Sequence, residues 1–197
     1  MFWRRLKTGR DCLSDRNEHD AMRGMKSLIA YFSRKGDNYV NRSIVNLPVG
    51  NTEVAANVIR KLTGGDEFRI RTVDDYPTDY NKTTDVAKQQ LRENARPKLS
   101  GHVDNMDEYS LIFLGYPNWW GTMPMPVFTF LEEYDFSGKT IIPFCTHEGS
   151  GLGRSESDIK KICPHATVLT GISIRGGSVH RAENDVSVWL SKSGVTI

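Results

Sequence analysis

The residue types best suited to ligand chemistry occur in residues 110–122, which read SLIFLGYPNWWGT. Residues 110–114 form a short apolar run typical of a buried strand, and Gly115-Tyr116-Pro117 ends it abruptly. Trp119 and Trp120 follow, and their flat apolar faces and indole N–H groups suit a planar ring with a polar edge. The alternative is that both side chains fill a domain or homodimer interface.

A second group of candidate ligands surrounds a predicted helix start. Residues 26–32 predict a central strand, and a long polar segment without clear periodicity separates it from Gly50. A helical pattern begins directly afterwards, with Asn51 or Thr52 as the expected N-cap. Because the first N–H groups of a helix lack partners, they favour an anion such as a phosphate. A capped helix after a loop is the simpler alternative. The candidates for the phosphate are Ser33, Lys35, Asn51 and Thr52.

The third candidate segment is the glycine-rich run 146–153, THEGSGLG, which follows a predicted strand over residues 139–145. Its glycines permit close backbone approach, and its hydroxyl and amide groups can bond the polar edge of a heterocycle. The alternative is a flexible surface turn. His147 and Glu148 resemble an acid/base pair, but adjacent side chains rarely face each other, so we do not assign them that role.

Strand-like and helical patterns alternate along the chain. Strands are expected over residues 26–32, 67–73, 110–114, 139–145 and 167–174, and helices lie between them and at residues 182–190. This alternation predicts an α/β fold, a three-layer doubly wound five-stranded parallel sheet in the order 2-1-3-4-5. In that order the loops after the first, third and fourth strands converge on one crevice. The nucleotide motifs G-x-x-x-x-G-K-[ST] and G-x-G-x-x-G are absent, which argues against P-loop and Rossmann sites.

Composition and charge narrow the class of protein. Residues 1–24 carry six Lys/Arg and four Asp/Glu without an apolar segment, and we expect a disordered N-terminal extension there and a single domain over residues 25–197. The remaining residues have balanced charge, which gives no support for nucleic-acid or membrane binding. Cys12, Cys145 and Cys163 show no metal-site spacing, so we expect plain thiols, no metal and a cytoplasmic protein.

Taken together, the three loops resemble the flavodoxin-like FMN-binding family. The resemblance rests on Ser33 with Gly50-Asn51-Thr52, on Tyr-Pro-x-Trp-Trp-Gly over 116–121, and on Thr-x-x-Gly-Ser-Gly-x-Gly over 146–153. It extends from Met25 to the C-terminus and is greatest for bacterial flavodoxin-like proteins with an insertion in the phosphate loop, here residues 34–49. It implies FMN as cofactor, held by Ser33, Lys35, Asn51, Thr52, Pro117, Asn118, Trp119, Trp120, Gly121, Thr122, Thr146, Glu148, Gly149, Ser150, Gly151 and Gly153.

The resemblance implies an oxidoreductase that passes electrons through FMN, in one of two ways. The protein is an enzyme that takes electrons from NAD(P)H and passes them to a quinone-like small molecule, or a flavodoxin-type carrier between protein partners. Carriers usually have an acidic docking surface, and the balanced charge weighs against that role. Tyr76 and Tyr80 either form the wall of an acceptor site or pack within their loop, and packing is the favoured interpretation.

Overall fold

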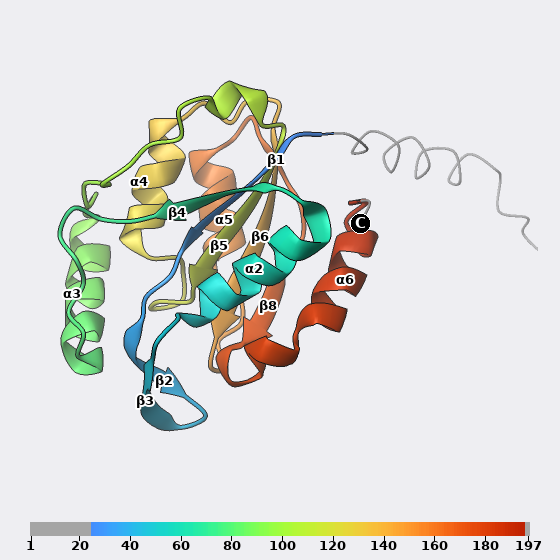
Figure 1. Ribbon diagram of the computed structural model, residues 1–197. Coiled ribbons are helices and arrows are strands. Elements are labelled where there is room, and N and C mark those ends of the chain that lie inside the picture. The colour runs from blue at the N-terminus through green and yellow to red at the C-terminus, as the bar shows by residue number, and fades with distance from the viewer. Residues whose placement is uncertain (1–24, 196–197) are drawn as a thin grey trace, which may run out of the picture.

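The central strand of the sheet is β1 (Ser27–Phe32), and all six of its residues are buried. The computed structural model describes residues 25–195 (Figure 1). All strand pairs of the main sheet are parallel, and their order is β4-β1-β5-β6-β7, with β8 pairing the second half of β6. The doubly wound order predicted from the sequence is therefore confirmed. The other strands are β4 (Asp66–Ile70), β5 (Leu111–Pro117), β6 (Thr140–His147), β7 (Thr167–Val168) and β8 (Ile172–Arg175).

Helices cover both faces of the sheet, which completes the three layers (Figure 1). Helices α2 (Asn51–Thr63) and α6 (Glu183–Lys192) pack on one face, where Ile59 and Leu190 join the same buried cluster. Helices α4 (Met125–Glu133) and α5 (Ser155–Ile162) pack on the opposite face through Phe130 and Ile159. Helix α3 (Tyr80–Glu93) lies next to α4. The cores are apolar because both faces of a parallel sheet are covered.

The segment expected to lack periodic structure forms a hairpin of β2 (Gly36–Val40) and β3 (Ser43–Leu47). Its two-residue turn places Asn41 and Arg42 at φ 50° and 69°, as a type I′ turn requires. The usual sequence for such a turn is Asn-Gly, and Arg in the second position concealed the hairpin. The hairpin projects from the carboxyl edge of the sheet (Figure 1).

Several element boundaries differ from the predicted ones. The N-cap of α2 is Gly50 and not Asn51 or Thr52. Helix α3 starts at Tyr80, where a helix start at Thr83 is expected from the sequence pattern; the Asp79 side chain caps it by accepting a hydrogen bond from the N–H of Lys82 (2.8 Å). The fifth strand is interrupted between β7 and β8, and a 3₁₀ helix, Gly176–Arg181, follows β8.

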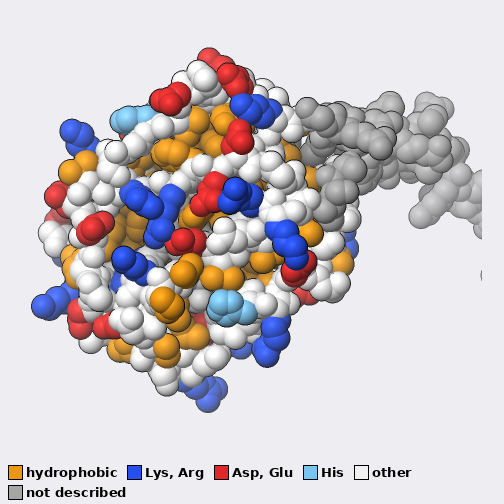
Figure 2. All heavy atoms as spheres, in the orientation of Figure 1, with side chains coloured by type: hydrophobic (Ala, Val, Ile, Leu, Met, Phe, Trp, Pro, Cys, Tyr) orange, Lys and Arg blue, Asp and Glu red, His pale blue; other side chains and the backbone are white. Residues whose placement is uncertain are grey.

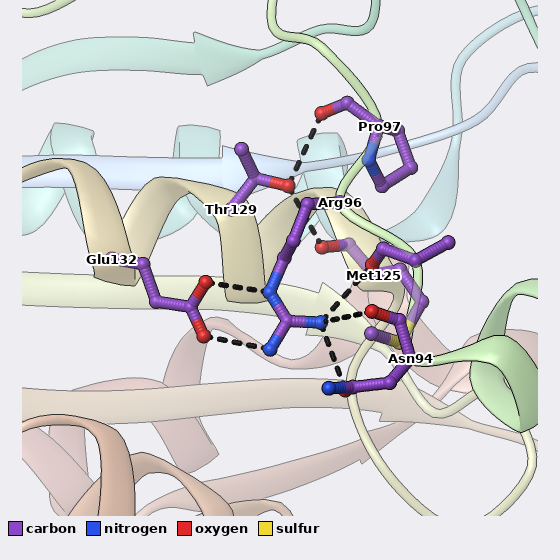
Figure 3. Close-up of polar contacts among 7 residues, drawn as sticks. Asn94, Arg96, Pro97, Met125, Thr129 and Glu132 are labelled. Atoms are coloured by element: carbon purple, nitrogen blue, oxygen red, sulfur yellow. Dashed lines mark hydrogen bonds and ion pairs between the residues drawn. The ribbon is translucent and has the colours of Figure 1, made fainter.

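An ion pair fixes the end of α3 against α4 (Figure 3). The Arg96 guanidinium donates to both carboxylate oxygens of Glu132, at 2.6 and 2.7 Å, and to the backbone and side-chain oxygens of Asn94, each at 2.9 Å. Thr129 Oγ1 donates to the Pro97 carbonyl nearby (3.1 Å). The hydrogen bonds and the positive charge of Arg96 lower the pKa of the Glu132 carboxyl. The Arg96–Glu132 ion pair is relevant to the cavity described next, because α3 and the loop before α4 both contribute to that cavity.

Both cysteines within residues 25–195 are buried free thiols. Burial raises the pKa of Cys145 to about 12 and that of Cys163 to about 11, so both stay protonated at neutral pH. Cys12 and the expected N-terminal extension lie outside the described residues. Within the described part of the chain, none of the helices combines the length and the apolar character that a bilayer-spanning segment needs.

Candidate functional site

The three loops singled out in the sequence meet at one cavity of about 710 Å³ at the carboxyl edge of the sheet. This is the position at which open α/β sheets usually bind ligands. The structure brings eleven predicted residues to its wall: Ser33, Asn51, Thr52, Pro117, Asn118, Trp119, Trp120, Thr146, Glu148, Gly149 and Ser150. The other five do not line it; these are the exposed Lys35 and, within the loops, Gly121, Thr122, Gly151 and Gly153.

The end of the cavity at β1 combines the N-terminus of α2 with the hydroxyls of Ser33 and Thr52. Ser33 Oγ accepts a hydrogen bond from the N–H of Glu53 (3.1 Å), which places the hydroxyl at the N-terminus of α2. Gly50, the N-cap of α2, has no room for a side chain, because a Cβ there would overlap Ser33 Oγ and the Arg34 carbonyl. Thr52 Oγ1 lies 2.7 Å from Thr146 Oγ1 and so connects this end to β6. Backbone N–H groups, the helix dipole and two hydroxyls therefore converge here.

Arg34, which was not among the predicted ligands, lines the cavity where Lys35 does not. Its guanidinium donates to the backbone carbonyls of Lys35 (3.0 Å), Asp37 (2.6 Å) and Thr78 (3.4 Å). Burial lowers the pKa of Arg34, and the nearby Asp37 and Asp79 oppose that shift. The side chain thus fixes the base of the hairpin to the segment before α3.

The tryptophan loop is a two-residue turn in which the two indoles point to different surroundings. Trp119 and Thr122 exchange backbone hydrogen bonds of 2.8 and 3.2 Å, and Trp120 and Gly121 between them have φ of 54° and 83°. The Trp119 ring packs edge-on against Phe32, at 5.4 Å between centroids. Trp120 is 49% exposed. Trp119 is therefore part of the core at the cavity wall, whereas Trp120 stands at its rim.

Asn118 joins the tryptophan loop to the glycine-rich loop. Its Nδ2 donates to the Gly151 carbonyl (2.8 Å), and its Oδ1 accepts from the N–H of Gly121 (3.0 Å). The Thr122 hydroxyl donates to Asp158 on α5 (2.7 Å). Gly121, Thr122 and Gly151 thus shape the two loops from behind the cavity wall.

His147 and Glu148 bond to different partners and do not form an acid/base pair. His147 Nδ1 accepts from the N–H of Gly149 (2.9 Å), and burial together with the charge of Arg175 lowers the pKa of the imidazole. The Glu148 carboxylate accepts from the N–H of Asn41 (3.1 Å) and of Gly177 (3.0 Å). Glu148 therefore holds the tip of the β2–β3 hairpin against the body of the protein.

Eight wall residues were not predicted as ligands: Arg34, Asn38, Tyr39, Tyr80, Thr83, Thr84, Ala87 and His147. Three of them come from the hairpin and its base, a segment whose sequence shows no clear periodicity. Four lie on one face of α3 at helical spacing, a signal that becomes visible once Asp79 is recognised as its N-cap. Tyr76 does not line the cavity; it packs against Phe32 and donates to Gln90 (2.6 Å), so for Tyr76 the packing interpretation is confirmed.

Comparison with known proteins agrees with this architecture. The family model described as flavodoxin matches residues 26–193. The chain belongs to the flavodoxin family. The family resemblance of the three loops is thereby confirmed. No curated protein matches the chain significantly.

Solved structures extend the comparison within the flavodoxin fold. A candidate flavoprotein from Bacteroides eggerthii DSM 20697 is 28% identical, with a TM-score of 0.72, and the match covers 88% of this chain and 100% of that one. A flavoprotein from Lactobacillus acidophilus NCFM, solved in complex with FMN, is 19% identical with a TM-score of 0.60 over 84% of this chain and 99% of that one. At 19% identity the second likeness concerns the fold alone.

Proposed function

We propose that this flavodoxin-family protein binds FMN in the cavity at the carboxyl edge and works as an oxidoreductase through it. The observation that carries the proposal is the convergence of an anion-binding helix start with two loops that can enclose a flat heterocycle around one cavity. The solved flavoprotein that contains FMN shares this fold. The residues present fit the cofactor, because they offer hydroxyls and amides at one end and apolar planar side chains at the other.

Each part of the cavity has a distinct task in holding the cofactor. Ser33 and Thr52, with the first amides of α2, would bind the phosphate, and Asn51 lies beside them on the wall. Pro117 to Trp120 would border one side of the ring, and Thr146 with residues 148–150 the other. Gly121, Thr122, Gly151 and Gly153 would let the two loops lie close together, since a Cβ at Gly153 would overlap the Gly121 carbonyl. Lys35 is exposed and does not line the cavity, whereas its neighbour Arg34 does line it but is bonded to backbone carbonyls.

When bound, FMN supplies the redox chemistry, and the chain's own residues bind, orient and shield it. The apolar surfaces of Pro117 and Trp119 would exclude water from one side of the ring. With Nδ1 accepting from Gly149, the neutral His147 imidazole carries its proton on Nε2. This tautomer fixes the loop that contacts the polar edge of the ring.

We further propose that electrons pass from NAD(P)H to a quinone-like small molecule. The charge balance supports an enzyme more than a carrier, because residues 25–197 carry as many Lys/Arg as Asp/Glu. On the one face that Figure 2 shows, the two kinds of side chain are interspersed. A carrier that docks on basic partners would be expected to show a large acidic field. The alternative, an electron carrier between protein partners, remains the second candidate because family members of that kind share the fold.

A spectrum and a steady-state assay test the proposal. We expect the purified protein, or the apoprotein after adding FMN, to show flavin absorption and to oxidise NADH or NADPH with a quinone as acceptor. A protein that takes up no FMN would overturn the site assignment. FMN uptake without turnover, together with reoxidation by a redox protein, would favour the carrier.

A further inference from the structure

One side of the cavity is formed by residues outside the three loops that would hold FMN. Tyr80, Thr83, Thr84 and Ala87 follow one another at helical spacing along the first half of α3. The hydroxyls of Thr83 and Thr84 are already engaged, since they donate to the carbonyls of Pro77 and Asn81 at 2.7 Å each. This face of α3 therefore presents small, largely apolar groups to the cavity.

Aromatic side chains border the same face of α3. Tyr39 from the hairpin stacks on Tyr80, with ring centroids 6.1 Å apart and an interplanar angle of 30°. Trp120 belongs to the same wall, and its Nε1 donates to the Thr84 carbonyl (3.1 Å). Tyr39, Tyr80 and Trp120 thus line one cavity together with the small residues of α3, and we call this part of the cavity the slot. Aromatic and small apolar groups around a cavity suit a flat ring.

The slot is held in place by bonds remote from it. Glu148 accepts from the N–H of Asn41 at the tip of the hairpin that carries Tyr39, and the N–H of Asp37 bonds the Thr78 carbonyl (3.2 Å). The Arg96–Glu132 pair fixes the other end of α3. The two walls are therefore positioned before any ligand arrives, which reduces the ordering that binding would require.

The charges around the slot favour a neutral ring over a dinucleotide. Arg34, the one Lys or Arg among the described residues that line the cavity, is committed to three backbone carbonyls and lies near Asp37 and Asp79. A pyrophosphate would need cations free to pair with it. Tyr39 is 42% exposed and Trp120 is 49% exposed, so a small molecule can reach the slot from solvent.

We propose that Tyr39, Tyr80 and Trp120 form an acceptor subsite that takes an uncharged, planar, quinonoid ring next to the FMN-binding loops. The inference rests on the proposed function, since it names where the acceptor binds and what kind of molecule it is. The proposal also gives the β2–β3 hairpin a function, which is to place Tyr39 beside the acceptor. Binding of the FMN phosphate would not require this hairpin.

Binding of duroquinone to the oxidised, FMN-loaded protein tests the subsite by equilibrium dialysis. Duroquinone is flat and uncharged, and its fully methylated ring cannot add thiols. We expect Tyr39→Ala to raise the duroquinone Kd about fivefold or more, the scale of one aromatic contact, and Tyr39→Phe to restore it. Thr84→Phe, which fills the slot, should weaken binding in the same way. Non-planar cyclohexanedione should bind more weakly than duroquinone to the unsubstituted protein.

The FMN dissociation constant, measured for the same variants, separates the possible failures. An FMN Kd that rises as much as the duroquinone Kd would show that the slot belongs to the cofactor site and would overturn the subsite alone. An unchanged duroquinone Kd in Tyr39→Ala and Thr84→Phe, or no binding at all, would also overturn it. Absence of FMN uptake by the unsubstituted protein would instead overturn the proposed function. If Thr84→Phe fails to fold, the exposed Tyr39 decides by itself.

Discussion

Thr52 Oγ1 and Thr146 Oγ1 lie 2.7 Å apart and join the start of α2 to the end of β6. Both side chains are almost completely buried, at 2% and 4% exposure, although they line a cavity that opens to solvent. The contact therefore couples the proposed phosphate end to the strand that leads into the glycine-rich loop. One hydrogen-bonded hydroxyl pair sets the distance between two segments that are far apart in the sequence.

Removing the Thr52 hydroxyl should weaken FMN binding. We expect Thr52→Ala to lower the binding free energy by about 1–2 kcal/mol, because a hydrogen bond to a charged phosphate is lost and Thr146 loses its partner. Fluorescence titration of the apoprotein with FMN measures the change. Thr52→Ser keeps the hydroxyl and serves as the matched control. Equal FMN affinity in Thr52→Ala and the unsubstituted protein would place the phosphate elsewhere.

Trp120 occupies a left-handed backbone conformation that favours glycine, with φ of 54°. Such a conformation costs a residue with a Cβ about 1 kcal/mol, so the turn keeps a bulky residue at an energetic cost. We expect the unfolding free energy of Trp120→Gly to exceed that of Trp120→Ala by about 1 kcal/mol, since only glycine relieves the strain. The urea midpoint of Trp120→Gly should therefore be the higher one. Both variants lose the indole and should lose duroquinone affinity alike. Identical unfolding curves for the two variants would argue against a strained turn.

The sheet order was predictable from the sequence because each central strand is a short apolar run ended by glycine, proline or polar residues. The hairpin was not, because its Asn41-Arg42 turn lacks glycine and β3 is mostly exposed, so no burial pattern marks it. The part of the site contributed by α3 depends on packing between distant segments. Tyr39 and Tyr80 stack on each other in the cavity wall, and nothing in either local sequence indicates that contact.

The difference between Trp119 and Trp120 was likewise beyond the sequence. The two residues are neighbours of the same type in one predicted loop. In the tight turn, the Trp119 ring packs against Phe32, whereas the Trp120 indole donates to the Thr84 carbonyl. Local sequence predicts that a turn occurs here. The direction of each ring depends on φ at Trp120 and on the position of α3, which are consequences of the whole fold.

His147 should make the stability of the protein depend on pH. Burial and Arg175 lower the pKa of this imidazole in the folded protein, while the charge of Glu148 acts in the opposite direction. The unfolded chain therefore takes up the proton first as pH falls below about 6.5, and unfolding becomes easier. The contribution is fully present above that pH and is lost as pH falls toward the lower pKa of the folded state. Protonation of Nδ1 would also break its bond from Gly149.

The matched variant for this effect is His147→Asn, whose side-chain oxygen can accept from Gly149 but does not titrate. Urea unfolding at about pH 8 and about pH 5.5, on either side of the ordinary imidazole pKa, measures the effect. We expect the unsubstituted protein to lose more stability between the two pH values than His147→Asn does. Parallel losses in the two proteins would mean that other groups account for the pH dependence.

Gly115 allows β5 and β6 to lie side by side just before the tryptophan loop. It pairs with Phe144 across the sheet, and a Cβ at Gly115 would overlap the Phe144 ring. We expect Gly115→Ala to destabilise the fold by roughly 1–3 kcal/mol, the usual cost of overfilling a packed core. Because the clash is with one side chain, Phe144→Leu in the same protein should recover part of the loss, although Phe144→Leu is destabilising alone. A double-mutant cycle from urea unfolding measures this coupling. If the two effects are strictly additive, the backbone conformation, and not the Phe144 ring, requires glycine at this position. If they are coupled, packing of the Phe144 ring fixes the end of β5, from which the tryptophan loop leads into the cavity.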